Sequence, residues 1–260
     1  MAGLPGRSSL PAPLYVIRGA RFLLDHRVLW KYAIAPMAIS TVVLGLSYYL
    51  LYHSFTALIH GIMGDGWYWQ VLYYLVVIVA ALLLLVVFFF IFTLLASAVA
   101  APFNDLISEK TEQLVTGNFS ETPFSFLQLL KDSARGIVHS LRILGIYLAL
   151  LVVALVLLLI PGFGGPLFTA ATVLLSSYML AYEYLGYPMD RRRFSFREKR
   201  AFLRSRFKAS MGFGLGNLAA ISIPVINLMV IPAAVVGGTL LFLELEPPVQ
   251  RSVESEHGKP

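Results

Sequence analysis

The chain has 260 residues, 58% of them hydrophobic and only 13% charged, and a formal net charge of +6. A soluble protein of this size needs a more polar surface, so the composition indicates an integral membrane protein. The positive charge lies beside apolar runs, which favours a role in membrane topology over nucleic-acid binding. The chain contains no cysteine, so disulfide bonds and thiolate metal sites are excluded.

The first segments lead the chain to the membrane. Residues 1–13 are rich in Pro, Ser and Gly, and they indicate a flexible tail rather than a cleavable signal peptide. Leu14 to Leu29 mixes charged and apolar residues, with Leu14, Ile17 and Arg21 near one face at helical spacing. We expect an amphipathic helix at the membrane interface there.

Two long apolar segments predict two spanning helices. The first covers about Tyr32 to Tyr52, with Pro36 in its first turns, where proline is tolerated. The second lies in the uncharged run from Gly66 to Asn104, which has 39 residues. A bilayer needs only about 20 apolar residues in a helix, so this run is too long for one simple span. We predict that its helix breaks at Pro102 and that a separate amphipathic segment follows.

Two later uncharged runs predict hairpins. Ile143 to Tyr182 is interrupted at Pro161–Pro166, which leaves arms of 18 and 16 residues that either just span the bilayer or dip into it. Ala209 to Leu243 is interrupted at Pro224 and Pro232, and its arms of 15 and 11 residues are too short to cross. The predicted fold is therefore all-α, with two long transmembrane helices, two partly penetrating helical hairpins and amphipathic interfacial helices.

The segment between the hairpins is basic and helical. Ser195 and Glu198 have the spacing of a capping box at the start of a helix that runs toward Lys208. We expect a single membrane domain over residues 14–243 and a disordered polar tail over residues 244–260.

The distribution of Lys and Arg predicts the topology. All 20 basic residues lie before the first span, between Lys110 and Arg142, between Arg191 and Lys208, or in the tail. None lies in the Tyr52–Trp67 loop or in the Pro161–Pro166 turn. The positive-inside rule then places both termini in the cytoplasm and makes both hairpins enter from that side.

The sequence lacks the usual signs of an enzyme. It has no phosphate-binding GxxxxGK[ST] loop, no HExxH and no GxSxG, and its five histidines lack metal-ligand spacing. The four apolar runs contain no Asp, Glu, Lys or Arg. Catalysis within a membrane usually depends on buried acidic side chains such as Asp and Glu. We expect no enzymatic activity, no cofactor and no metal.

Two features could bind an anion, because anions bind where backbone N–H groups and basic side chains meet at a helix N-terminus. The first is the basic cluster before the first span, formed by Arg21, Arg27, Trp30 and Lys31. Simple anchoring at the interface is the alternative, and from the sequence alone it is the favoured interpretation of Arg27 and Lys31. The second is the turn of Pro161, Gly162, Gly164 and Gly165, for which tight hairpin geometry is the alternative.

Polar residues near the helix breaks are candidates for a pathway. They are Asn104, Asn217 and Asn227. Each could line a path for an ion, cap a helix or bond to a neighbouring helix.

Several motifs, in the same order and spacing, resemble the CysZ sulfate permease family, which is related to the etoposide-induced membrane proteins. They include Ala100–Asn104 followed by Glu109 and Glu112, Ile160–Gly164, Tyr187–Asp190, and Ile223–Leu228 with Pro232–Ala234. The resemblance covers about Leu14 to Leu243. It implies a bacterial inner-membrane permease that admits sulfate for cysteine synthesis and assembles as an oligomer.

One stretch departs from this family. Where the family carries a Gly-apolar-Arg-Arg sulfate site before the first span, this chain has Val28-Leu29-Trp30-Lys31. Lys is a point charge and does not reproduce a paired guanidinium fork, so Arg27 or Arg21 would have to compensate.

The leading hypothesis is a channel-like oxyanion permease that is not driven by ATP, with sulfate as substrate. The expected partners are sulfate or a related oxyanion, membrane lipids and further copies of the chain, and not nucleic acid. The alternatives are a permease for another oxyanion, or a non-transporting membrane scaffold or stress-related protein of the same fold.

Overall fold

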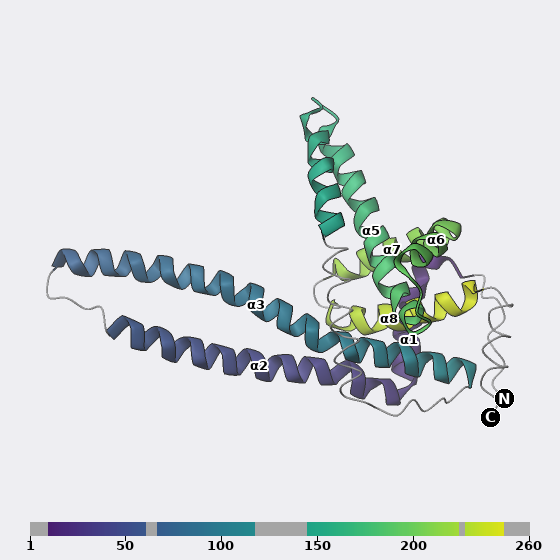
Figure 1. The fold of residues 1–260 in the computed structure, drawn as a ribbon, viewed down its shortest axis with the longest axis horizontal. Helices are drawn as coiled ribbons and strands as arrows, with labels where there is room; N and C mark the ends of the chain where they lie inside the picture. The colour runs from purple at the N-terminus through teal and green to yellow at the C-terminus, as the bar shows by residue number, and fades with distance from the viewer. Residues whose placement is uncertain (1–9, 61–66, 118–144, 224–226, 247–260) are drawn as a thin grey trace. The chain divides into compact units, whose positions relative to one another are not determined.

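The computed structural model describes residues 10–60, 67–117, 145–223 and 227–246, which are helical and contain no strand. A helix over residues 145–155 has no label in Figure 1. The labelled elements are η1 (Ala12–Leu14), α1 (Tyr15–Asp25), α2 (Arg27–His60), α3 (Trp67–Thr116), η2 (Val156–Leu159), α5 (Gly164–Arg191), α6 (Phe196–Ser205), α7 (Phe207–Ile221) and α8 (Asn227–Leu245).

The chain forms two compact units. One contains residues 34–103, which are the larger parts of α2 and α3, running in opposite directions (Figure 1). The other contains the residues before and after this segment, including α1 and α5 to α8. The two helices that pass between the units are therefore α2 and α3.

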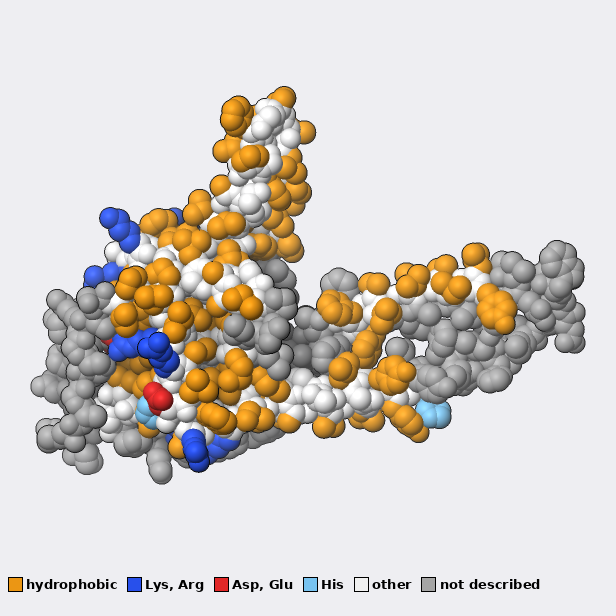
Figure 2. All heavy atoms as spheres, turned by 180° about the vertical axis from the view of Figure 1, so that it is seen from behind, with side chains coloured by type: hydrophobic (Ala, Val, Ile, Leu, Met, Phe, Trp, Pro, Cys, Tyr) orange, Lys and Arg blue, Asp and Glu red, His pale blue; other side chains and the backbone are white. Residues whose placement is uncertain are grey.

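Apolar side chains cover the outside of the described part of the 34–103 unit. Val42, Tyr48 and Leu83 are 69%, 65% and 62% exposed, and Figure 2 shows hydrophobic side chains along these helices. Helices that are apolar on every face suit a lipid environment. Among the described residues, Arg27–Leu50 of α2 and the whole of α5 are long and apolar enough to cross a membrane.

The predicted break at Pro102 is wrong, because α3 continues through Pro102 to Thr116 as one helix of 50 residues. Proline removes one backbone hydrogen bond, but a long helix held by tertiary contacts can tolerate that loss. The contacts beyond Pro102 come from Ile107, Ser108 and Thr111, which are all fully buried. The amphipathic segment is thus the end of α3 and not a separate helix.

Close backbone contacts join α1 to α8. A Cβ atom at Gly19 would lie 2.1 Å from the Ala233 carbonyl oxygen, and one at Gly237 would lie 2.3 Å from the Tyr15 carbonyl oxygen. Small residues let two helices approach this closely. The buried face of α1 is Tyr15, Val16, Gly19 and Leu23, whereas the predicted face residues Leu14 and Ile17 are 40% and 52% exposed.

The glycines of α7 have the same role. A Cβ atom at Gly214 would lie 1.9 Å from the Ser177 carbonyl oxygen of α5, and one at Gly216 would lie 2.3 Å from the Pro13 carbonyl oxygen. The alternating glycines thus serve two packing faces, one toward α5 and one toward η1.

The first hairpin turns earlier than predicted. The chain reverses between η2 and Phe163, and α5 already includes Gly164, Gly165 and Pro166. Proline fits there because the first residues of a helix have no intrahelical partner for their N–H groups. α5 then continues through Pro188 to Arg191, so its 28 residues reach about 42 Å instead of ending near Tyr182.

The second run also forms longer helices than predicted. α8 passes through Pro232 without a break and ends at Leu245, two residues beyond the expected limit of the domain. Residues 232–243 are all buried, which explains why this segment is apolar on every side. The bend near Pro224 lies outside the described residues.

Candidate anion-binding site

The basic cluster lies at the corner between α1 and α2. α1 ends at Asp25 and α2 begins at Arg27, so His26 is the only residue between them. Leu23 and Leu29, on either side of the corner, are 2% and 0% exposed and fix it to the core. The imidazole Nδ1 of His26 lies 2.9 Å from the Phe22 carbonyl oxygen.

Trp30 braces this corner. Its indole N–H donates to the Leu23 carbonyl oxygen at 2.8 Å, which joins the first turn of α2 to the last turn of α1. The ring itself is 42% exposed. Trp30 therefore holds the two helices at their angle and cannot give the same N–H to an anion.

Three cations at the corner face outward. Arg21, Arg27 and Lys31 are exposed, and within the described chain none of them forms an ion pair. Arg27 is the first residue of α2, where the helix dipole disfavours a positive charge. An anion at this position would be attracted by the guanidinium and by the positive end of the helix dipole together.

Lys31 lies one turn further along α2. Its ammonium group lies 4.9 Å from the centre of the Tyr32 ring, close enough for a cation–π contact. The structure thus brings Arg27, Trp30 and Lys31 together in the first turns of α2, with Arg21 near the end of α1.

Two of the predicted pathway asparagines are buried in helix contacts. The Asn104 amide donates to the Tyr187 hydroxyl at 3.2 Å and so joins α3 to α5. The Asn217 amide donates to the Phe213 carbonyl oxygen at 2.9 Å, and its Oδ1 has no hydrogen-bond partner in the described chain. Asn227 begins α8.

The glycine turn shows tight hairpin geometry. Gly162 has a positive φ of 80°, which favours glycine, and a Cβ at Gly164 would lie 2.6 Å from the Leu157 carbonyl oxygen. Pro161 is exposed, and Gly165 has open space around it. These contacts account for Gly162 and Gly164 without an anion.

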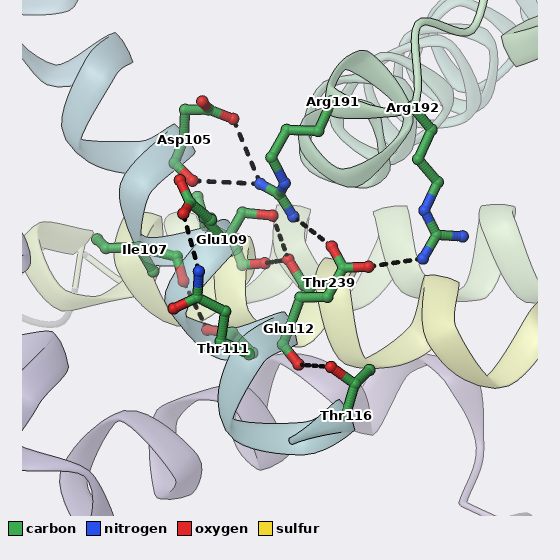
Figure 3. Close-up of polar contacts among 12 residues, drawn as sticks. Asp105, Ile107, Glu109, Thr111, Glu112, Thr116, Arg191, Arg192 and Thr239 are labelled. Carbon is green, nitrogen blue, oxygen red and sulfur yellow. Dashed lines mark hydrogen bonds and ion pairs between the residues drawn. The ribbon is translucent and has the colours of Figure 1, made fainter. Parts of the chain in front are cut away.

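An ionic cluster that the sequence did not predict joins α3 to the end of α5. Figure 3 shows Arg191 reaching across to α3, where it donates to Glu112 at 2.7 Å and to the Asp105 carboxylate at 3.3 Å. Arg192 donates to the other oxygen of Glu112 at 2.6 Å. One carboxylate thus receives two guanidinium groups.

The same cluster extends to α8 and α1. Arg192 also pairs with Glu246, just past the end of α8, and its guanidinium lies 4.8 Å from the Phe242 ring centre. Arg18 of α1 donates to Glu244 at 2.5 Å, and the Tyr15 hydroxyl bonds to the same carboxylate. We name this set (Tyr15, Arg18, Asp105, Glu112, Arg191, Arg192, Glu244 and Glu246) the ionic cluster.

A sequence signal for the ionic cluster existed, although it was weak. The acidic residues follow apolar runs, in the last turns of α3 and around the end of α8. Arg191 and Arg192 likewise follow the apolar part of α5, at its C-terminal end. Opposite charges at the ends of neighbouring apolar helices are expected to pair. The pairing itself depends on tertiary contacts that no local pattern reveals.

We name the corner that carries Arg21, Arg27, Trp30 and Lys31 the basic corner. These features define the class as a helical membrane protein with two apolar candidate spans, the basic corner and the ionic cluster. The family model for sulfate transporter CysZ and etoposide-induced protein 2.4 matches residues 15–232. The chain belongs to this family, as its motifs suggested.

Curated bacterial relatives agree with this assignment. The sulfate transporter CysZ of Pseudomonas fluorescens is 36% identical over 95% of this chain and 96% of its own length. That of Salmonella typhi is 35% identical over 82% of this chain and 85% of its own. The match to the Pseudomonas aeruginosa transporter is 38% identical but spans 60% of this chain and 63% of that protein, just under two thirds. The relatives are bacterial and the helices apolar, so this is a bacterial membrane protein.

Proposed function

We propose that this protein is an oxyanion permease with sulfate as its substrate, channel-like and not driven by ATP. The observation that carries the proposal is the basic corner, where Arg27 and Lys31 stand exposed in the first turns of α2 without an acidic partner in the described chain. The relatives are named as sulfate transporters, which are not enzymes. The chain contains no phosphate-binding loop that could couple transport to ATP.

We place the protein in the bacterial inner membrane, where it would supply sulfate for cysteine synthesis. One chain with two long spans and two hairpins hardly encloses a pore, so we propose a homo-oligomer. Anions would collect at Arg21, Arg27 and Lys31, held by the corner that Trp30 braces, and pass along a path near the helix breaks. Asn217 is the best pathway candidate, because its buried Oδ1 lacks a hydrogen-bond partner among the described residues.

Sulfate uptake into proteoliposomes tests this proposal. We expect the native protein to accumulate radiolabelled sulfate above empty vesicles and other oxyanions to compete. The double variant Arg27→Ala/Lys31→Ala should lose about tenfold or more of this uptake, because each cation supplies a charge-assisted hydrogen bond.

A matched control removes the same two charges elsewhere. Arg206→Ala/Lys208→Ala replaces two exposed cations that have no ion pair in the described chain, and it should keep native uptake. Equal uptake by the native protein and the Arg27/Lys31 variant would remove the basic corner from the proposal. No flux of any oxyanion through the native protein would instead favour a non-transporting scaffold.

A further inference from the structure

A row of three arginines lies on α6. Arg197, Arg200 and Arg204 are all exposed, and their spacing of three and four residues places them on one face of the helix. At 3.6 residues per turn they fall within an arc of about 60°. We name these three residues the arginine row.

The other side of α6 fixes the row to the protein. Leu203 is fully buried, and the Phe202 ring lies 5.3 Å from the Phe242 ring of α8. The buried Lys199 pairs with Asp190 at 2.5 Å. α6 therefore presents the row on a helix whose position is set before any partner binds.

The charge of the row is not neutralised by the described part of the protein, in which no acidic side chain pairs with Arg197, Arg200 or Arg204. The two nearest acidic residues in sequence have other contacts. Asp190 binds Lys199, and Glu198 accepts the Ser195 N–H at 2.6 Å.

The row lies next to the end of a candidate membrane span. α5 ends at Arg191 and α6 begins five residues later, at Phe196. Phe207, two residues past the last turn of α6, is 56% exposed. An exposed aromatic ring beside basic side chains is typical of a surface that meets the headgroup layer.

We propose that the arginine row binds the phosphate headgroups of anionic phospholipids in the leaflet that α5 enters. The guanidinium group forms paired hydrogen bonds with phosphate, and basic residues beside a span bind anionic lipids electrostatically. This site is separate from the basic corner of α1 and α2, and it takes a lipid of the surrounding membrane instead of the transported ion. Phosphatidylcholine, which has no net charge, would bind the arginine row more weakly, because its choline group cancels the phosphate charge.

Thermal unfolding of the purified full-length protein in a neutral detergent tests the proposal. A ligand that binds the folded state raises the midpoint, so dioctanoyl-phosphatidylglycerol should raise it and dioctanoyl-phosphatidylcholine should not. Each arginine near an anionic surface is worth about fivefold in affinity. The variant Arg197→Gln/Arg200→Gln/Arg204→Gln should therefore need at least tenfold more phosphatidylglycerol for the half-maximal shift.

A charge-matched variant and two other probes complete the experiment. Arg197→Lys/Arg200→Lys/Arg204→Lys should keep the preference for phosphatidylglycerol over phosphatidylcholine, at reduced affinity. The single glutamine variants serve as a second series if the triple variant unfolds at a lower midpoint without lipid. Three results would overturn the proposal. The first is that the native and glutamine proteins give equal phosphatidylglycerol titrations, and the second is that inorganic phosphate raises the midpoint as much as phosphatidylglycerol does. The third is that a DNA duplex, and not the lipid, binds in a way that depends on the arginine row.

Discussion

At the scale of single residues, Glu112 stands out because it joins three helix ends. It receives hydrogen bonds from Arg191 at 2.7 Å and from Arg192 at 2.6 Å, and Arg192 also pairs with Glu246. Burial alone would raise the pKa of Glu112, but the hydrogen bonds and charges of Arg191 and Arg192 outweigh it, so the pKa lies below the usual 4.5.

This lowered pKa predicts an acid-sensitive contribution to stability. A carboxylate whose pKa is lower in the folded state stabilises the fold above its unfolded pKa of 4.5, and the contribution is lost as the pH falls through the folded pKa. The native protein should therefore lose more of its unfolding midpoint between pH 7 and pH 3 than Glu112→Gln does. Parallel midpoint curves for the two proteins would show that the cluster does not depend on this charge.

At the scale of helices, close contacts through glycine decide which helices can meet. α7 approaches α5 at Gly214, where any side chain larger than hydrogen would overlap the backbone of Ser177. The Ser177 backbone cannot move away by a rotamer change, as a flexible side chain could. The contact is therefore intolerant of even a methyl group.

The substitution Gly214→Ala tests this contact. We expect it to lower stability by about 2 kcal/mol or more, because the helices must move apart to admit the methyl group. Gly45→Ala is the matched control, since no atom lies within 4 Å of a Cβ there and alanine favours a helix. Thermal unfolding in detergent measures both, and equal midpoints would contradict the close approach.

The start of α6 depends on its capping box. The Ser195 hydroxyl accepts the Glu198 N–H at 3.4 Å, and the Glu198 carboxylate accepts the Ser195 N–H at 2.6 Å. α6 has ten residues, a length at which an isolated helix is unstable. Ser195→Ala should raise amide hydrogen exchange in the first turn of α6 roughly fivefold while exchange in α8 stays unchanged. Unaltered exchange in α6 would show that its buried face alone holds it.

At the scale of the whole molecule, the sequence could predict the apolar runs, the Ser195 capping box and the family, since each depends on local or ordered patterns. Continuation of α3 and α8 through Pro102 and Pro232 could not be predicted, because tertiary contacts compensate for the lost hydrogen bonds. The ionic cluster was missed for a similar reason: Glu112 and Arg191 are far apart in sequence. The basic corner was found from Arg27 and Lys31, but the brace from Trp30 to Leu23 required the structure.

The charge distribution predicts the orientation of the chain. The absence of native cysteine allows single cysteines to report it. A membrane-impermeant maleimide should label His60→Cys in intact spheroplasts and Ser255→Cys only after permeabilisation, since every basic segment is proposed to be cytoplasmic. Labelling of Ser255→Cys in intact spheroplasts would reverse the proposed orientation of the tail.

Both helices that join the two units carry a proline near the boundary. Pro36 lies three residues beyond Ala33, the last residue before the boundary in α2, and Pro102 lies two residues before Asn104 in α3. Each proline removes one backbone hydrogen bond from its helix. Pro36 and Pro102 are therefore the positions at which α2 and α3 lose the fewest backbone hydrogen bonds on bending.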